Sequence, residues 1–396
     1  MGLGLPLVSV DAAYVATWQA TEQRIKTVCG ALGRPIEALR DHSYYISALA
    51  RLKSEGVVVK SSGDVEFTDA ALLSFNAGPW SKDTSVKELT DFNVRTTCSS
   101  MGQGSKLHAR IMRCINALQA TTVHAGLNDT FAKEVMLSAG GHMVGKFWSV
   151  LPKLTSMFMD NDHFRMSMQL RLALVQLPCV ALCQLSRATD IDDKCLVEMT
   201  DPCIHPHLCK RGPARQRPHR ALMVSMKKVL ERAGAEVDLE RAIPALYRMD
   251  SEGKVTEAIL DAVIIPPGCP SSTPVDVTIR CPHAQRTNKR ASVVPSIAAD
   301  EGESDKFNRY GRSVLPLALE TYGRMGHKSL HTVTFLANHV VAATVASRFH
   351  RGSDFIAALR LDLERSLLWS IADVTLLSIG HSCQIWRTSH RLGQSG

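Results

Sequence analysis

Three mostly apolar runs stand out in the C-terminal half of the chain. Residues 259–265 and 274–279 are largely aliphatic apart from Asp261 and Asp276, and residues 315–320 form a third run. Apolar runs of about four to eight residues, rich in β-branched side chains, are typical of strands. The pattern therefore predicts three strands, two of which carry a carboxylate in their interior.

Helical periodicity surrounds these strands. Leu222, Met226, Val229 and Leu230 recur at the spacing of one helix face, and Gly234 follows as a stop. Beyond the strands, the pattern predicts a loop over 285–305, helices over about 328–348 and 354–372, and a tail over 381–396.

The N-terminal half is mainly helical in pattern, with segments over 10–55, about 104–125 and 143–186 and a hairpin near 56–68. We therefore predict an α+β chain. Its parts would be a helical module over 1–150, a helical linker with a Cys/His-rich segment over 151–212, and a three-layer α/β domain with a small mixed sheet over 213–380.

Composition permits a polyanionic partner without requiring one. The 46 Lys and Arg residues against 38 Asp and Glu residues give a net charge of +8. The 11 cysteines are irregularly spaced, which argues against a disulfide framework and favours a reducing compartment. The most apolar stretch, 172–185, is interrupted by Gln176 and Pro178 and is too short to span a bilayer, so we expect an intracellular protein without a membrane segment.

The carboxylates within the apolar strands carry the chemical prediction. A buried carboxylate needs a positive partner, and two on adjacent strands could share a divalent cation. Lys306, with Tyr310 one helical turn later, adds an amine suited to phosphate chemistry, and Glu320 is a further candidate ligand. Aspartates near strand ends also cap turns or pair with arginines, which would make the same residues structural.

Side-chain alternation places Asp276, Thr278 and Arg280 on one face of their strand, opposite its apolar face. Polar groups thus gather on one side of the predicted sheet. If the strands bearing Asp261 and Asp276 pair, both carboxylates can reach one metal ion.

Residues 201–330 resemble the restriction-like endonuclease domain at the C-terminus of non-LTR retrotransposon polyproteins, a member of the PD-(D/E)XK nuclease superfamily. The resembling stretches are Asp201–Cys209, Arg217–His219, Leu260–Asp261, Val275–Thr278, Lys306–Tyr310 and Pro316–Gly323.

The resemblance implies a nuclear, Mg²⁺- or Mn²⁺-dependent hydrolase that cleaves target DNA so that the new 3′ end primes reverse transcription. Asp261, Asp276 and Lys306 would take the catalytic positions, with Tyr310 in support. Two departures are present: Leu260 replaces the expected proline, and Thr278 stands where many members of the superfamily place the catalytic lysine. No polymerase sequence is visible, so the reverse-transcriptase module would be encoded elsewhere, and the element RNA is a second expected partner.

The Cys/His-rich segment suggests a zinc site. Cys195, Cys203, His205 and Cys209 have the right chemistry, and the resembling family carries a zinc-knuckle-like cluster here. The tight cysteine pair of a knuckle is missing, and Cys183 falls within the predicted apolar helix, so a degenerate site is the alternative.

Basic residues near this segment and in the loop could contact phosphates through charge. They are Arg211, Arg215, Arg217, Arg220, Lys289 and Arg290. The sequence thus favours a retrotransposon-derived, Mg²⁺-dependent DNA endonuclease. The alternative is a catalytically inactive nucleic-acid-binding remnant of a mobile-element protein.

Overall fold

The chain divides into two compact units, residues 1–128 and 129–396, each of which is considered by itself. The computed structural model describes residues 12–13, 15–16, 43–60, 64–82, 103–140, 144, 159–174, 182–187, 190–199, 204–211, 214–249, 252–343 and 352–379.

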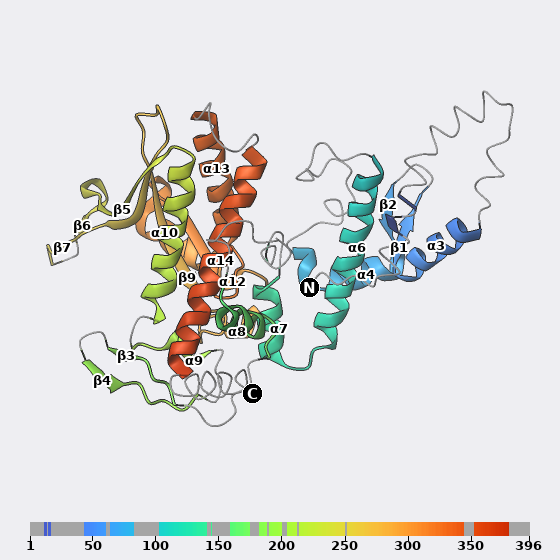
Figure 1. The fold of residues 1–396 in the computed structure, drawn as a ribbon, viewed down its shortest axis with the longest axis horizontal. Coiled ribbons are helices and arrows are strands. Elements are labelled where there is room, and N and C mark those ends of the chain that lie inside the picture. The colour runs from blue at the N-terminus through green and yellow to red at the C-terminus, as the bar shows by residue number, and fades with distance from the viewer. Residues whose placement is uncertain are drawn as a thin grey trace, which may run out of the picture. The chain divides into compact units, whose positions relative to one another are not determined.

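The first unit is a small hairpin packed among helices (Figure 1). Val57 pairs with Phe67 and Val59 with Val65, which confirms the predicted hairpin. Gly56 adopts a φ of +86°, and a Cβ there would meet Ala71 at 2.6 Å, so the turn into the hairpin requires glycine. The elements are α3 (Ser43–Ser54), β1 (Val57–Val59), β2 (Val65–Phe67), α4 (Asp69–Ala77), η1 (Pro79–Lys82) and α6 (Gln103–Gly126).

The second unit is built on a four-stranded mixed sheet in the order β10-β9-β8-β5. Strands β5 and β8 are antiparallel, β8 and β9 are antiparallel, and β9 and β10 are parallel. These strands are β5 (Glu236–Ala242), β8 (Ile259–Ile265), β9 (Thr273–Arg280) and β10 (Leu315–Glu320). The expected α+β class and three strands are confirmed, whereas β5 was not predicted.

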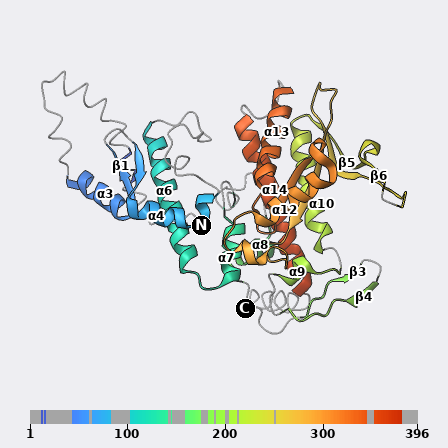
Figure 2. The same cartoon turned by 180° about the vertical axis from the view of Figure 1, so that it is seen from behind.

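Helices cover both faces of this sheet (Figures 1 and 2). On one face, α10 (Gln216–Arg232) and α14 (Gly352–Ile379) share an apolar cluster with Val275, Val277 and Leu317. The predicted face of α10 is buried as expected, and the helix ends before Gly234 at a φ of +92°.

The other face of β9 lies under α12 (Ile297–Tyr310). A Cβ at Gly302 would come within 2.8 Å of the Thr278 side chain and 3.3 Å of Arg280. Helix and strand can approach this closely only because residue 302 has no side chain.

Two sequence predictions are wrong. Residues 285–305 are not one loop, because α11 (Asn288–Ala291) and most of α12 lie within them. The helical stretch within 143–186 was expected to end near Pro178 or soon after, but α8 (Asn161–Arg171) ends earlier, and 182–187 is extended and includes β3 (Ser186–Arg187). A leucine-rich run has no period that distinguishes a helix from a strand. Tertiary contacts therefore determine which structure such a segment adopts.

The remaining elements of the second unit connect and flank these layers. They are α7 (Thr130–Ser138), β4 (Asp190–Lys194), α9 (His205–Leu208), η5 (Pro244–Leu246), β6 (Arg248–Met249), β7 (Val255–Thr256), η6 (Gly311–Ser313) and α13 (His327–Ala343). Among the described helices of both units, none is both long and apolar enough to cross a bilayer.

Candidate active site and metal centre

The two predicted aspartates lie together. Ala262 pairs with Val275 in the antiparallel β8–β9 ladder, so Asp261 and Asp276 occupy the next opposing positions and share a face of the sheet. Their carboxyls interact directly. We call Asp261 and Asp276 the diacid pair.

Lys306 completes the predicted set from α12. Its Nζ lies 2.7 Å from Asp276 Oδ2, and both side chains are largely buried. Tyr310, one turn further along α12, is also buried, and its pKa is raised by burial and by the nearby charge of Asp276. The structure therefore brings together four residues from three elements, as the sequence predicted.

His219, which was not among the predicted site residues, joins the diacid pair from the first turn of α10. Its Nε2 lies 3.1 Å from Asp261 Oδ2, and the same oxygen accepts a 2.6 Å hydrogen bond from the backbone N–H of Val277. The only sequence signal was the Arg217–His219 stretch of the family resemblance, because periodicity does not reveal where a helix end meets a sheet.

The diacid pair is electrostatically asymmetric. Burial and the neighbouring Asp261 carboxyl raise the pKa of Asp276 to about 7, although Lys306 acts to lower it. Burial would also raise the pKa of Asp261, but hydrogen bonds from His219 and Asp276 hold it below its ordinary value. The contact with Asp261 raises the pKa of His219 in turn.

This donor set fits a hard divalent cation. Two carboxylates that face each other in a buried place repel when both are ionised, and a cation between them would remove the repulsion. Oxygen ligands from one or two carboxylates, completed by water and substrate phosphate, are what Mg²⁺ takes in proteins. Asp261 and Asp276 would be the residues that hold it.

Two other predicted site residues make structural contacts away from the diacid pair. Thr278 is on the same face of β9 as Asp276 but packs beneath Gly302 of α12. Glu320 pairs in register with Arg280, four positions along β9 from Asp276, and accepts a hydrogen bond from the Ala298 N–H at the start of α12. Burial raises the pKa of Glu320 to about 7, and its contacts are those of a helix cap.

The predicted phosphate-contacting residues divide into two groups. Arg211 forms an ion pair with Asp193, Arg217 with Asp373, and Arg290 with Glu301, so these charges are partly neutralised within the unit. The second group is exposed and consists of Arg215, Arg220 and Lys289.

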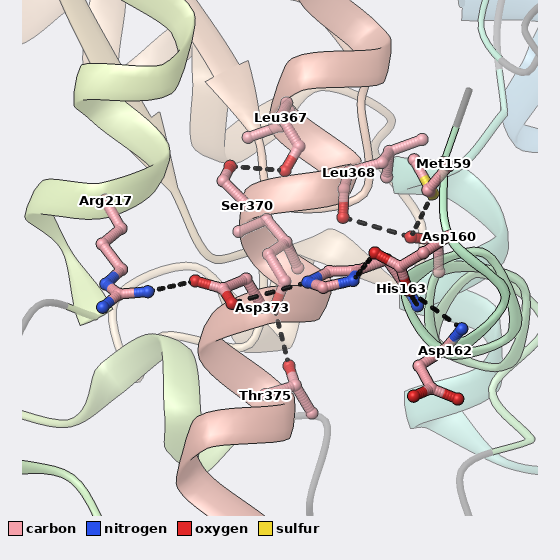
Figure 3. A network of polar contacts seen from close by, with 12 residues as sticks. Met159, Asp160, Asp162, His163, Arg217, Leu367, Leu368, Ser370, Asp373 and Thr375 are labelled. Atoms are coloured by element: carbon pink, nitrogen blue, oxygen red, sulfur yellow. Dashed lines mark hydrogen bonds and ion pairs between the residues drawn. The ribbon is translucent and has the colours of Figure 1, made fainter. Parts of the chain in front are cut away.

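Arg217 belongs to a chain of polar contacts joining α8, α14 and α10 (Figure 3). His163 Nδ1 lies 2.5 Å from Asp160 Oδ2, and its Nε2 lies 3.4 Å from Asp373 Oδ1, whose second oxygen pairs with Arg217. The pKa of each acid is lowered against the effect of burial, mainly by hydrogen bonds with His163. We call Asp160, His163, Asp373 and Arg217 the α8–α14 network.

A Cys/His cluster lies at one end of the same unit. Cys183, Cys195, His205 and Cys209 place their ligand atoms within 4.8 Å of one another. The Cys183 and Cys209 sulfurs are 4.0 Å apart, and Cys195 Sγ is 3.4 Å from His205 Nε2. Tetrahedral zinc with Zn–S near 2.3 Å needs ligand separations of about 3.5–3.8 Å, so this cluster could bind a metal such as zinc.

Three predicted ligands of this cluster are present, and the fourth differs. Cys183 lies in an extended segment rather than in a helix, and its N–H donates a hydrogen bond to the Val197 carbonyl. Cys195 lies on the neighbouring segment. Helix α9 and the residue after it supply His205 and Cys209. Cys203, the predicted ligand, lies outside the described residues.

Comparison of the chain with protein-family models, with curated proteins and with solved structures finds no match.

Proposed function

We propose that the second unit is a Mg²⁺- or Mn²⁺-dependent DNA endonuclease of the PD-(D/E)XK type, derived from a non-LTR retrotransposon and acting in the nucleus. The observation that carries the proposal is the diacid pair, on adjacent antiparallel strands, with an amine from α12 on Asp276. Its acids meet a histidine and a lysine rather than arginines.

Each residue has a defined part in this proposal. Asp261 and Asp276 hold the cation, which would polarise the scissile phosphate and acidify a bound water. His219 and the Val277 N–H fix the orientation of the Asp261 carboxylate. Lys306 offsets negative charge at the phosphate, and Tyr310 limits the access of water to the lysine.

The alternative, a nucleic-acid-binding remnant, is favoured by one observation. Lys306 already pairs with Asp276, and Thr278 offers no amine in its place. Exposed basic residues such as Arg215, Arg220 and Lys289 would still attract phosphates. DNA, element RNA and a reverse-transcriptase module are the partners we propose in either case.

Nicking of supercoiled plasmid separates the two functions. With Mg²⁺ or Mn²⁺ we expect nicking by the wild type and a loss of at least about 100-fold in Asp276→Asn and Lys306→Met. Asp238→Asn, an exposed acid on β5, is the matched control and should nick normally.

Two outcomes would contradict the endonuclease. Nicking that persists in Asp276→Asn would exclude the diacid pair as its origin. A wild type that binds DNA in a salt-dependent manner but never nicks would establish the binding remnant instead.

A further inference from the structure

A cleft of about 350 Å³ opens beside the diacid pair in the second unit. It shares His219 and Val277 with that site but extends away from it along β9. His207, Arg215, Thr278, Arg280 and Arg286 are among the other residues that line it.

The cleft lies along the part of β9 where its pairing with β8 has ended. The β8–β9 ladder extends only to the Ala262–Val275 pair, whereas β9 continues beside β10 to Arg280. One edge of β9 is therefore left without a strand partner. The Val277 N–H points to this edge, where it bonds Asp261, and strand alternation turns the Ile279 N–H to the same side.

His207 is the most informative lining residue. Its side chain is buried, with 9% exposure, and neither ring nitrogen has a hydrogen-bond partner among the described residues. A buried imidazole in this condition is costly to maintain. It is explained if a ligand in the cleft supplies the missing acceptor.

The start of α10 borders the same space. Its 17 residues begin at Gln216, and Arg215 at the N-cap position makes no side-chain cap bond within the described structure. The dipole of a helix of this length favours an anion at this end. Arg215 adds a full positive charge and is exposed.

Charge is unevenly distributed along the cleft. At its far end Arg286 lies 3.0 Å from Glu301, and Arg280 lies 2.8 Å from Asp305, so those arginines are already neutralised. Glu301 is the one acid among the described lining residues, and it is already paired with Arg286, whereas Arg215 is exposed. An anion therefore belongs at the α10 end.

We propose that the α10 end of this cleft binds a phosphodiester of the substrate strand next to the scissile bond. The proposal rests on the proposed function for the identity of the substrate. A cleft of this size is at the small end of ligand sites, which suits one phosphodiester with part of its nucleotide rather than a duplex. Arg215 and the α10 N-terminus hold the phosphate, and His207 donates an N–H to it.

Binding of a fluorescent single-stranded deoxyoligonucleotide, measured by anisotropy without added Mg²⁺ or Mn²⁺ over 50–200 mM salt, tests this without any cleavage. Arg215→Gln should weaken binding about 3- to 10-fold and reduce the slope of log Kd against log salt by about 0.7, the value for one phosphate contact on a single strand. Arg232→Gln, an exposed arginine at the opposite end of α10, is the control and should change neither quantity.

His207→Phe provides a second readout. A lost neutral donor should weaken binding while the salt slope stays unchanged, provided that circular dichroism shows a native fold. If Arg215→Gln behaves like Arg232→Gln, the subsite is wrong, whatever the nicking assay shows. If Arg215→Gln weakens binding as described but the wild type never nicks, the subsite stands and only the nuclease proposal fails.

Discussion

The diacid pair and the α8–α14 network both hold two aspartates close to basic side chains. They differ in how the negative charge of these aspartates is balanced. In the network His163 lies between Asp160 and Asp373, Arg217 closes the chain, and the pKa of each acid is lowered. In the diacid pair the carboxyls meet each other, and the pKa of Asp276 is raised to about 7.

This difference indicates that the network has a structural role and the diacid pair a chemical one. A satisfied network such as that of Figure 3 stabilises helix packing and has no need of a ligand. A buried acid whose pKa is raised is destabilised when ionised, and such arrangements concentrate at functional sites. Loss of a network acid should therefore harm stability, whereas loss of Asp276 should harm activity.

The largest expected effect concerns the Cys/His cluster, which could bind a metal beside α14. Cys183 Sγ lies 3.1 Å from Ser378 Oγ on α14, the helix that also carries Asp373. Cys183→Ser and Cys209→Ser should lose one zinc equivalent by elemental analysis and about 4 kcal/mol or more of unfolding free energy, because loss of a structural metal is among the costliest changes. Cys269→Ser is the control; retention of zinc in Cys183→Ser would contradict the four-ligand cluster.

A smaller effect distinguishes the two acidic sites directly. At pH 8 without added Mg²⁺ or Mn²⁺, Asp276→Asn should raise the unfolding free energy by about 1–2 kcal/mol, whereas Asp373→Asn should lower it by about 1 kcal/mol. Because the folded pKa of Asp276 is raised, its ionisation destabilises the fold progressively from about pH 4 to 7, so the gain should vanish near pH 4. Thermal melts across this range measure both changes.

The stability that Asp373→Asn loses should depend on pH in the opposite direction. A lowered folded pKa gives stability that is present above the ordinary value and disappears as pH falls through the lowered one. Equal and parallel pH curves for the two variants would remove the contrast between the sites.

The smallest expected effect tests the contribution of His163 to the network. Contacts with Asp373 and Asp160 raise its pKa against the effect of burial, so its stabilisation is full below the ordinary pKa of 6.5 and is lost as pH rises through the raised value. His163→Gln should therefore cost about 0.5–1 kcal/mol more at pH 6 than at pH 9 in denaturant titrations. His331→Gln, which replaces an exposed histidine on α13, is the control.

Sequence patterns predicted the framework of the site well. Strands β8 and β9 were recognised from continuous aliphatic runs, and their antiparallel pairing brought Asp261 opposite Asp276. Lys306 was predicted as part of a helix, which the structure places in α12.

What the sequence did not reveal depends on tertiary contacts. Helix α12 is polar for most of its length, and its buried positions include small residues such as Ala298 and Gly302, which carry no strong apolar period. His219 approaches Asp261 only once α10 packs on the sheet. The leucines around Cys183 suggested a helix, whereas backbone hydrogen bonds with residues such as Leu196 and Val197 hold that segment extended.

The close approach of Gly302 to Thr278 limits how this site could be altered. A lysine at position 278 would need the volume that α12 now occupies, so the amine could return to the strand only if the helix were lifted from the sheet. Displacing α12 would in turn withdraw Lys306. The strand and helix positions of the amine therefore compete for the same space.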